Sequence, residues 1–96
     1  MTIEIKSFLT LRRVMGNQAC IEMTCGPVTI QELLRVLAER FGSGFKAMVF
    51  EEGSSTVGPH VRILVNGKHY GILPEKLDTI LNPGDEIGLF PPIAGG

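Results

Sequence analysis

The sequence closes with Glu86-Ile87-Gly88-Leu89-Phe90-Pro91-Pro92-Ile93-Ala94-Gly95-Gly96, a stretch that predicts a final strand followed by a short tail. In an extended strand successive side chains point to opposite faces, so Ile87 and Leu89 share one face, which we assign to the core. Gly88 and Phe90 then fall on the opposite face, where we expect Phe90 to be exposed; the alternative is that its ring packs back onto its own surface. The chain divides into one domain over residues 1–90 and a flexible tail over residues 91–96.

The composition of the tail suits passage through a narrow channel. Pro91 and Pro92 each fix φ near about −65° and favour an extended backbone. Gly95 and Gly96 carry no Cβ, and as the last two residues of the sequence they have no following chain to turn. We expect this tail to be presented to a partner, with an inert frayed end as the alternative.

The first half of the chain predicts a hairpin and one long helix. Residues 3–11 begin with strand alternation, a bulge or change of face is expected near Ser7, and residues 19–24 predict a second strand. Thr29 and Glu32 form the sequence signature of a capping box at a helix start. Gly42 marks the end of this helix. Its apolar face has helical spacing and consists of Ile30, Leu33, Leu34, Leu37, Ala38 and Phe41.

The second half predicts shorter elements. Residues 45–50 fit a helical turn and residues 51–59 an exposed loop, although residues 42–60 are the least informative part of the sequence. A β-branched run over 61–65 ends at Asn66-Gly67, the preferred two-residue hairpin turn. An edge strand over 68–72, a short helical crossover over 73–81 and a tight turn at 83–85 follow.

This order of elements predicts an α+β domain with the β-grasp (ubiquitin-like) architecture. We expect a mixed sheet of four to five strands covered by one main helix. The final strand should lie centrally and parallel to the first, because the long helix supplies the crossover that parallel pairing requires.

Two segments resemble a known family. Residues 82–96, NPGDEIGLFPPIAGG, closely resemble the carboxyl end of the small subunit of molybdopterin synthase and, more broadly, the MoaD/ThiS family of ubiquitin-like sulfur carriers. Residues 61–67, VRILVNG, resemble the strand and turn of that family. The rest of the chain is similar only in its order of elements.

The resemblance implies a function for the tail. Gly96 would be adenylated by a ubiquitin-activating-type adenylyltransferase that uses ATP, and then converted to a thiocarboxylate with sulfur from a persulfide donor. The thiocarboxylate would enter the large subunit of molybdopterin synthase, or another acceptor enzyme, and give its sulfur to the substrate. The residues implied to contact these partners are Phe90, Pro91, Pro92, Ile93, Ala94 and Gly95.

Other sequence features argue against a stand-alone enzyme. No glycine-rich phosphate loop is present, and His60 and His69 are isolated in the sequence. Cys20 and Cys25 do not have a common zinc spacing, so we expect reduced cysteines and no metal or bound cofactor. The net charge of −1, the lack of a long apolar run and an amino terminus without signal-peptide features favour a cytoplasmic protein that binds neither nucleic acid nor membrane.

Three other functions remain open. The chain could carry sulfur for thiamine or cysteine biosynthesis, although the Phe-Pro-Pro approach favours the molybdopterin branch. It could be a protein modifier whose carboxyl terminus forms isopeptide bonds with lysines. It could also be a β-grasp binding module with an inert tail.

Overall fold

A computed structural model describes residues 1–51, 53–54 and 56–91 of the chain. Its elements in chain order are β1 (Thr2–Ser7), α1 (Leu9–Val14), β2 (Cys20–Thr24), α2 (Ile30–Phe41), α3 (Ser43–Val49), β3 (Arg62–Val65), β4 (Lys68–His69), the 3₁₀ turns η1 (Tyr70–Ile72) and η2 (Lys76–Asp78), and β5 (Glu86–Phe90). Among these described residues, no helix is long and apolar enough to span a membrane.

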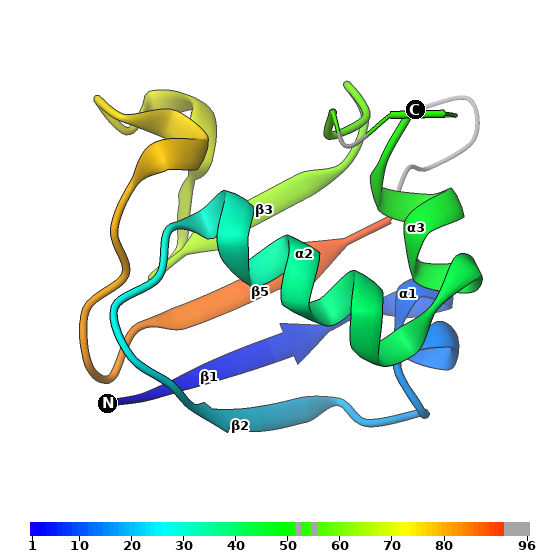
Figure 1. Cartoon of the computed structure of the whole chain (residues 1–96), viewed down its shortest axis with the longest axis horizontal. Coiled ribbons are helices and arrows are strands. Elements are labelled where there is room, and N and C mark those ends of the chain that lie inside the picture. Colours follow the sequence, from blue (N-terminus) through cyan, green and yellow to red (C-terminus); the bar gives the residue numbers. More distant parts are fainter. Residues whose placement is uncertain (52, 55, 92–96) are drawn as a thin grey trace.

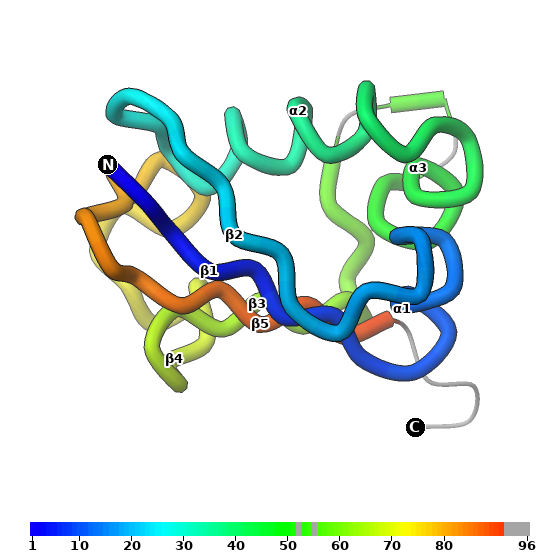
Figure 2. Tube along the Cα trace, turned by 90° about the horizontal axis from the view of Figure 1, so that it is seen from below, coloured from blue at the N-terminus to red at the C-terminus, as the bar shows by residue number. Residues whose placement is uncertain are grey.

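The five strands form one mixed sheet in the order β2-β1-β5-β3-β4, which confirms the predicted β-grasp (Figure 1). β5 pairs in parallel with β1 and antiparallel with β3. The last strand of the sequence therefore lies at the centre of the sheet, as predicted, with both of its edges hydrogen-bonded. Figure 2 shows α2 lying as a separate layer on one side of this sheet.

The helix α2 begins at the predicted capping box. The Thr29 backbone N–H donates to Glu32 Oε1 at 2.9 Å, and the Glu32 N–H donates to Thr29 Oγ1 at 3.1 Å. Two backbone donors of the first turn are thereby satisfied. Gly42 follows the last residue of the helix with φ of 79°, a conformation that glycine adopts without steric cost. The buried face of the helix packs on the sheet through Ile30, Leu33, Leu34, Leu37 and Ala38.

The first strand is shorter than the sequence suggested. β1 ends at Ser7 rather than at Leu11, and α1 begins at Leu9, within the segment that we expected to continue as strand. The fully buried Ser7 donates from Oγ to the carbonyl of Gln18 at 2.6 Å, and Arg12 Nε donates to the Ser7 carbonyl at 3.1 Å. Leu11 and Met15, four residues apart, are both fully buried. These contacts favour a helical turn over continued strand.

The later part of the chain differs from the prediction at β4 and in the loop that follows α3. β4 stops at His69 instead of extending to Ile72, because His69 Nδ1 accepts the Gly71 N–H at 2.9 Å and starts a 3₁₀ turn. The short helical crossover predicted over residues 73–81 is present as the 3₁₀ turn η2. The helical turn predicted over residues 45–50 is confirmed as α3. Within the loop predicted to be exposed, Val57 is buried and pairs with Phe50 in an isolated bridge.

Candidate functional site

The candidate site is the end of β5, from which the tail of the sequence departs. Ile87 and Leu89 are fully buried against the core, as predicted. Pro91, which we had assigned to the flexible tail, is buried as well. The point of departure is therefore anchored on the central strand of the sheet. The other predicted site residues, Pro92, Ile93, Ala94, Gly95 and Gly96, lie outside the described residues.

Phe90 is less exposed than the alternating pattern suggested. Its side chain is half-buried, and its ring is stacked on that of Phe8 with centroids 4.2 Å apart and an interplanar angle of 2°. Phe8 also donates its backbone N–H to the Leu89 carbonyl at 3.2 Å, extending the parallel pairing of β1 and β5. The alternative of self-packing therefore holds for one face of the ring, and the expectation of a freely exposed Phe90 is wrong.

Sequence reasoning missed Phe8 as part of this site. The signal was present, because Phe8 and Leu9 are the residues at which the strand alternation breaks. The parallel register pairs Ser7 with Leu89, so the next positions along the two strands are Phe8 and Phe90. Only knowledge of that register identifies Phe8 as the partner of Phe90. The two rings form an apolar platform on the face of the sheet opposite α2.

Gly88 lies beneath this platform and is buried. A Cβ built at this position would lie 3.7 Å from ring carbons of both Phe8 and Phe90 and 3.8 Å from Leu64 Cβ. These are ordinary van der Waals distances, so one methyl group fits. A longer side chain would have to displace a ring.

We expect Gly88→Ala to preserve or raise the free energy of unfolding, by up to about 1 kcal/mol, because alanine restricts the unfolded chain and fits the space above Gly88. Gly88→Leu should lower the free energy of unfolding by about 1–3 kcal/mol, because it forces the Phe8 and Phe90 rings apart. Urea unfolding followed by circular dichroism measures both. Equal stability of the two variants would show that the platform is not packed as described.

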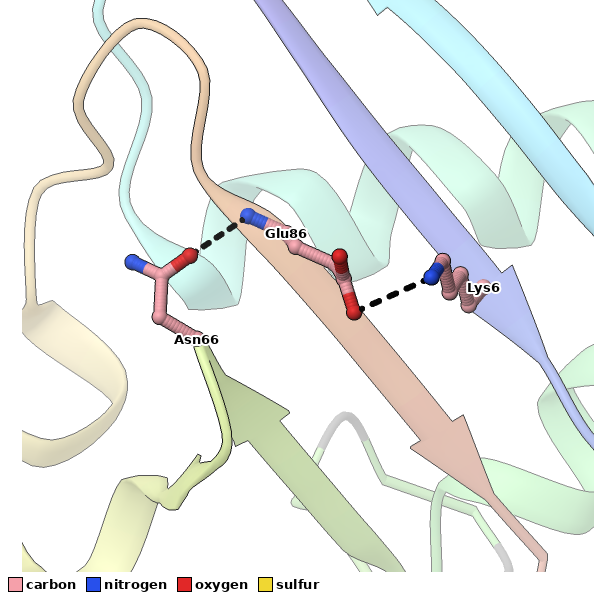
Figure 3. Close-up of polar contacts among 3 residues, drawn as sticks. All are labelled: Lys6, Asn66 and Glu86. Carbon is pink, nitrogen blue, oxygen red and sulfur yellow. Dashed lines mark hydrogen bonds and ion pairs between the residues drawn. The ribbon is translucent and has the colours of Figure 1, made fainter.

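The opposite end of β5 is fixed by polar contacts. Asn66 Oδ1 accepts the Glu86 N–H at 3.0 Å (Figure 3). Asn66 Nδ2 donates to Asp85 Oδ1 at 2.9 Å. Asp85 Oδ2 in turn accepts the Asn82 N–H at 2.7 Å, which closes the turn before β5. Asn66 thus has two roles, since its φ of 51° also forms the predicted turn after β3. The sequence indicated only the turn.

An ion pair crosses the exposed face of the sheet. Lys6 Nζ on β1 lies 3.3 Å from Glu86 Oε1 on β5 (Figure 3), and the two side chains are 40% and 47% exposed. Because solvent screens such pairs, this contact contributes at most about 1 kcal/mol. The pair links β1 and β5, which are neighbouring parallel strands of the sheet.

The chemistry available on the described part of the chain is limited. No cluster of three or more histidine, cysteine or acidic side chains there could hold a metal ion. Cys20 is exposed and Cys25 half-buried, and both are free thiols. His69 stacks on Tyr70, with ring centroids 4.8 Å apart. The arrangement therefore presents an anchored strand end and an apolar platform, which suit docking to a partner.

Comparisons with known proteins agree with this architecture. The profile of the ThiS family matches residues 5–96. Small archaeal modifier protein 3 of Haloferax volcanii is 33% identical over 96 residues, which cover all of both chains. A Haloferax volcanii protein solved in solution has a TM-score of 0.81 and 34% identity, covering 100% of this chain and 87% of that one.

A further solved structure comes from Pyrococcus furiosus, of a protein provisionally named subunit 1 of molybdopterin converting factor. It has a TM-score of 0.73 and 27% identity, covering 97% of this chain and 99% of that one. The family match begins within β1, at Ile5, and includes β5 and the Gly-Gly end of the sequence. It therefore confirms the resemblance seen in residues 61–67 and 82–96. The chain belongs to the ThiS family of ubiquitin-like β-grasp proteins, whose members are sulfur carriers or small protein modifiers.

Proposed function

We propose that this chain is a sulfur carrier that holds sulfur as a thiocarboxylate on Gly96 and delivers it for molybdopterin synthesis. The observation that carries the proposal is the family match through residue 96, which includes Gly95 and Gly96 in the matched segment. The partners are an activating enzyme of the ubiquitin-activating type, a persulfide donor and an acceptor enzyme.

The first step makes the terminal carboxylate reactive. A carboxylate is a poor acyl donor, because its negative charge is delocalised and repels nucleophiles. When the Gly96 carboxylate attacks the α-phosphorus of ATP, pyrophosphate leaves and an acyl-adenylate forms. The activating enzyme must supply the ATP site, because the sequence has no phosphate-binding loop.

The second step introduces sulfur. The terminal sulfur of a persulfide attacks the acyl-adenylate carbonyl carbon, and AMP leaves. A second thiol on the donor side then breaks the sulfur–sulfur bond by thiol–disulfide exchange, leaving the thiocarboxylate on Gly96 and a disulfide on the donor. Cys20 and Cys25 of this chain are not required for either step.

The scaffold contributes an anchored starting point for the tail. Pro91 is buried and Phe90 stacks on Phe8, so the direction of the chain is set where β5 ends. Five residues follow Pro91, and when extended they reach about 16–18 Å. In this proposal the tail begins after Pro91, and Pro92 continues the extended approach while the two glycines enter the active site of the partner.

The molybdopterin branch is favoured by two observations. Residues 82–96 resemble the small subunit of molybdopterin synthase, and a structural relative at 27% identity is provisionally named subunit 1 of molybdopterin converting factor. The acceptor would then be the synthase large subunit and the substrate cyclic pyranopterin monophosphate. Thiamine or cysteine biosynthesis would use the same tail chemistry with another acceptor.

A second candidate function is protein modification. It is favoured by the relative named small archaeal modifier protein 3, which is 33% identical over the full length of both chains. In that case a lysine amine, rather than a persulfide, attacks the activated Gly96 carbonyl and forms an isopeptide bond. Both candidates share adenylation, so the nucleophile that follows distinguishes them.

Intact-mass measurement tests the proposal. The chain is incubated with its activating enzyme, ATP, a persulfide donor and a lysine-rich acceptor protein, with a control that lacks ATP. A mass gain equal to replacement of one oxygen by sulfur, localised to Gly96 by fragmentation, supports sulfur carriage. Lysine conjugates without sulfur gain would favour modification, and an unchanged mass with an enzyme that activates another carrier would reject both.

A further inference from the structure

The segment after the Asn66-Gly67 turn has two competing conformations. Tyr70 and Ile72 are β-prone residues, and the sequence predicts an edge strand over residues 68–72. In the structure β4 stops at His69, and the 3₁₀ turn η1 takes the place of the rest of that strand. Figure 2 shows β4 at the edge of the sheet, where one side of the strand faces solvent.

His69 starts η1 as a hydrogen-bond acceptor. Its Nδ1 atom lies 2.9 Å from the backbone nitrogen of Gly71, and that N–H group can only donate. Nδ1 therefore carries no proton, and the imidazole is neutral with its proton on Nε2. A second proton would be added at Nδ1, where it would face the Gly71 N–H. Protonation of His69 thus removes the bond that starts η1.

Few other contacts hold η1 in place. None of its side chains is buried, and Ile72 is 72% exposed. One backbone bond closes the turn, from the Leu73 N–H to the Tyr70 carbonyl at 3.0 Å. The rings of His69 and Tyr70 also stack, with centroids 4.8 Å apart. A segment with so few buried contacts has low local stability and opens without unfolding the domain.

The outer edge of β3 provides the alternative conformation. β4 pairs only with Leu64 and Val65 of β3, so among the described residues Ile63 has no strand partner on that side. The same antiparallel register, continued by one residue, places Tyr70 opposite Ile63. Pairs that exchange backbone hydrogen bonds alternate from the pair that flanks a two-residue turn. Tyr70 and Ile63 would therefore exchange two such bonds, which offset the bonds lost with η1.

The charged groups around His69 are of mixed sign and exposed. They are Lys68 on β4, Arg62 on β3, and Glu75, Lys76 and Asp78 in or beside η2, and the other titratable neighbour is the phenol of Tyr70. Within the described part of the chain, none of these charged groups forms an ion pair with the imidazole. The bond to Gly71 is therefore the contact that depends on the protonation of His69.

We propose that residues 68–71 form a pH-sensitive switch, in which neutral His69 holds η1 and protonated His69 lets β4 extend to Tyr70 along β3. Histidine changes its charge between about pH 5 and pH 8, so the turn belongs to the upper end of this range and the strand to the lower end. The direction follows from the bond to Gly71, which is made only by the neutral ring. The switch also controls a sheet edge, because η1 leaves Ile63 open to a strand of another protein and the extended β4 covers it.

NMR spectroscopy of the full chain at pH 7.5 and pH 5 tests the switch. At pH 5 we expect cross-strand contacts between the amide protons of Tyr70 and Ile63. The hydrogen-exchange protection factor of the Ile63 amide should rise about 10-fold relative to pH 7.5. The ring-current shifts from the stacking of His69 on Tyr70 should disappear, because successive side chains of a strand point to opposite faces.

Two variants of His69 fix the switch in one state. His69→Asn should keep the turn at both pH values, because asparagine accepts an N–H from two residues ahead and does not titrate. His69→Lys should show the strand at both pH values, because an ammonium group only donates. His60→Gln is the matched control, since His60 is the other histidine of the chain and is exposed, and it should keep the full pH response.

Four outcomes would overturn the inference. The first is a turn that persists at pH 5 although the ring shifts show that His69 is protonated. The second is opening of η1 without contacts between Tyr70 and Ile63. The third is an unchanged pH response in His69→Asn, and the fourth is loss of the response in His60→Gln. Because Gly96 takes no part in the switch, each of these outcomes leaves the proposed function standing.

Discussion

Valine in place of Gly95 is expected to abolish adenylation of Gly96 and to leave the free energy of unfolding unchanged. The reason is steric, because a β-branched side chain widens the tail next to the reacting carboxylate. The χ1 angle of valine is also restricted, so the side chain has few conformations in which to fit the channel. Because a displacement of about 1 Å at a reacting group can cost about 100-fold in rate, we expect kcat/KM in ATP–pyrophosphate exchange to fall at least about 100-fold. That loss corresponds to about 2.7 kcal/mol of transition-state stabilisation.

The control for this variant is the same substitution at Gly26. That glycine is exposed, a Cβ built on it meets no atom within 4 Å, and its φ lies outside the left-handed region. Gly26→Val should therefore be activated normally. Normal adenylation of Gly95→Val would contradict the proposal that the tail enters a narrow channel of the activating enzyme. A lower free energy of unfolding for this variant would show that the tail contributes to the packing of the domain.

The features predicted correctly from the sequence are those with a local cause. The start of α2 follows from Thr29 and Glu32, three residues apart, and its buried face follows from helical spacing within twelve residues. The turn after β3 follows from Asn66-Gly67 alone. The central place of β5 required one further step, the rule that parallel strands need a crossover connection. Each of these inferences uses neighbouring residues or a general rule of topology.

The missed features depend on contacts between distant residues. The stacking of Phe8 on Phe90 joins the two ends of the sequence, and the break in alternation at Phe8 does not identify Phe90 as its partner. The side-chain bonds of Asn66 reach Asp85 and Glu86, 19 and 20 residues away. α1 has only six residues, too few for periodicity to distinguish it from a strand that changes face. Tertiary contacts decide all three, and two of them shape the surface around the tail.

Alanine in place of Ile87 should have the reverse effect of Gly95→Val. We expect a large loss in the free energy of unfolding and little loss in the adenylation of Gly96. Ile87 is fully buried on β5, where it pairs with Ile5 on one side and Val65 on the other. Removing its buried methyl and methylene groups leaves a cavity and should lower the free energy of unfolding by about 2–5 kcal/mol. Urea unfolding measures this change, and Ile80→Ala, at a position 62% exposed, should change stability by less than about 0.5 kcal/mol.

The functional half of that prediction follows from the stability of a domain of this size. A 96-residue domain has a free energy of unfolding of about 5–14 kcal/mol. Because the expected loss reaches the lower end of this range, the adenylation rate of Ile87→Ala is compared per mole of folded protein, as measured by circular dichroism. Its tail and its Phe8–Phe90 platform are unaltered, and adenylation at 25 °C should then stay within about 3-fold of the unmodified chain. The folded variant could instead lose adenylation as completely as Gly95→Val. In that case adenylation would depend on the exact packing of β5, and the strand would do more than hold the start of the tail in place.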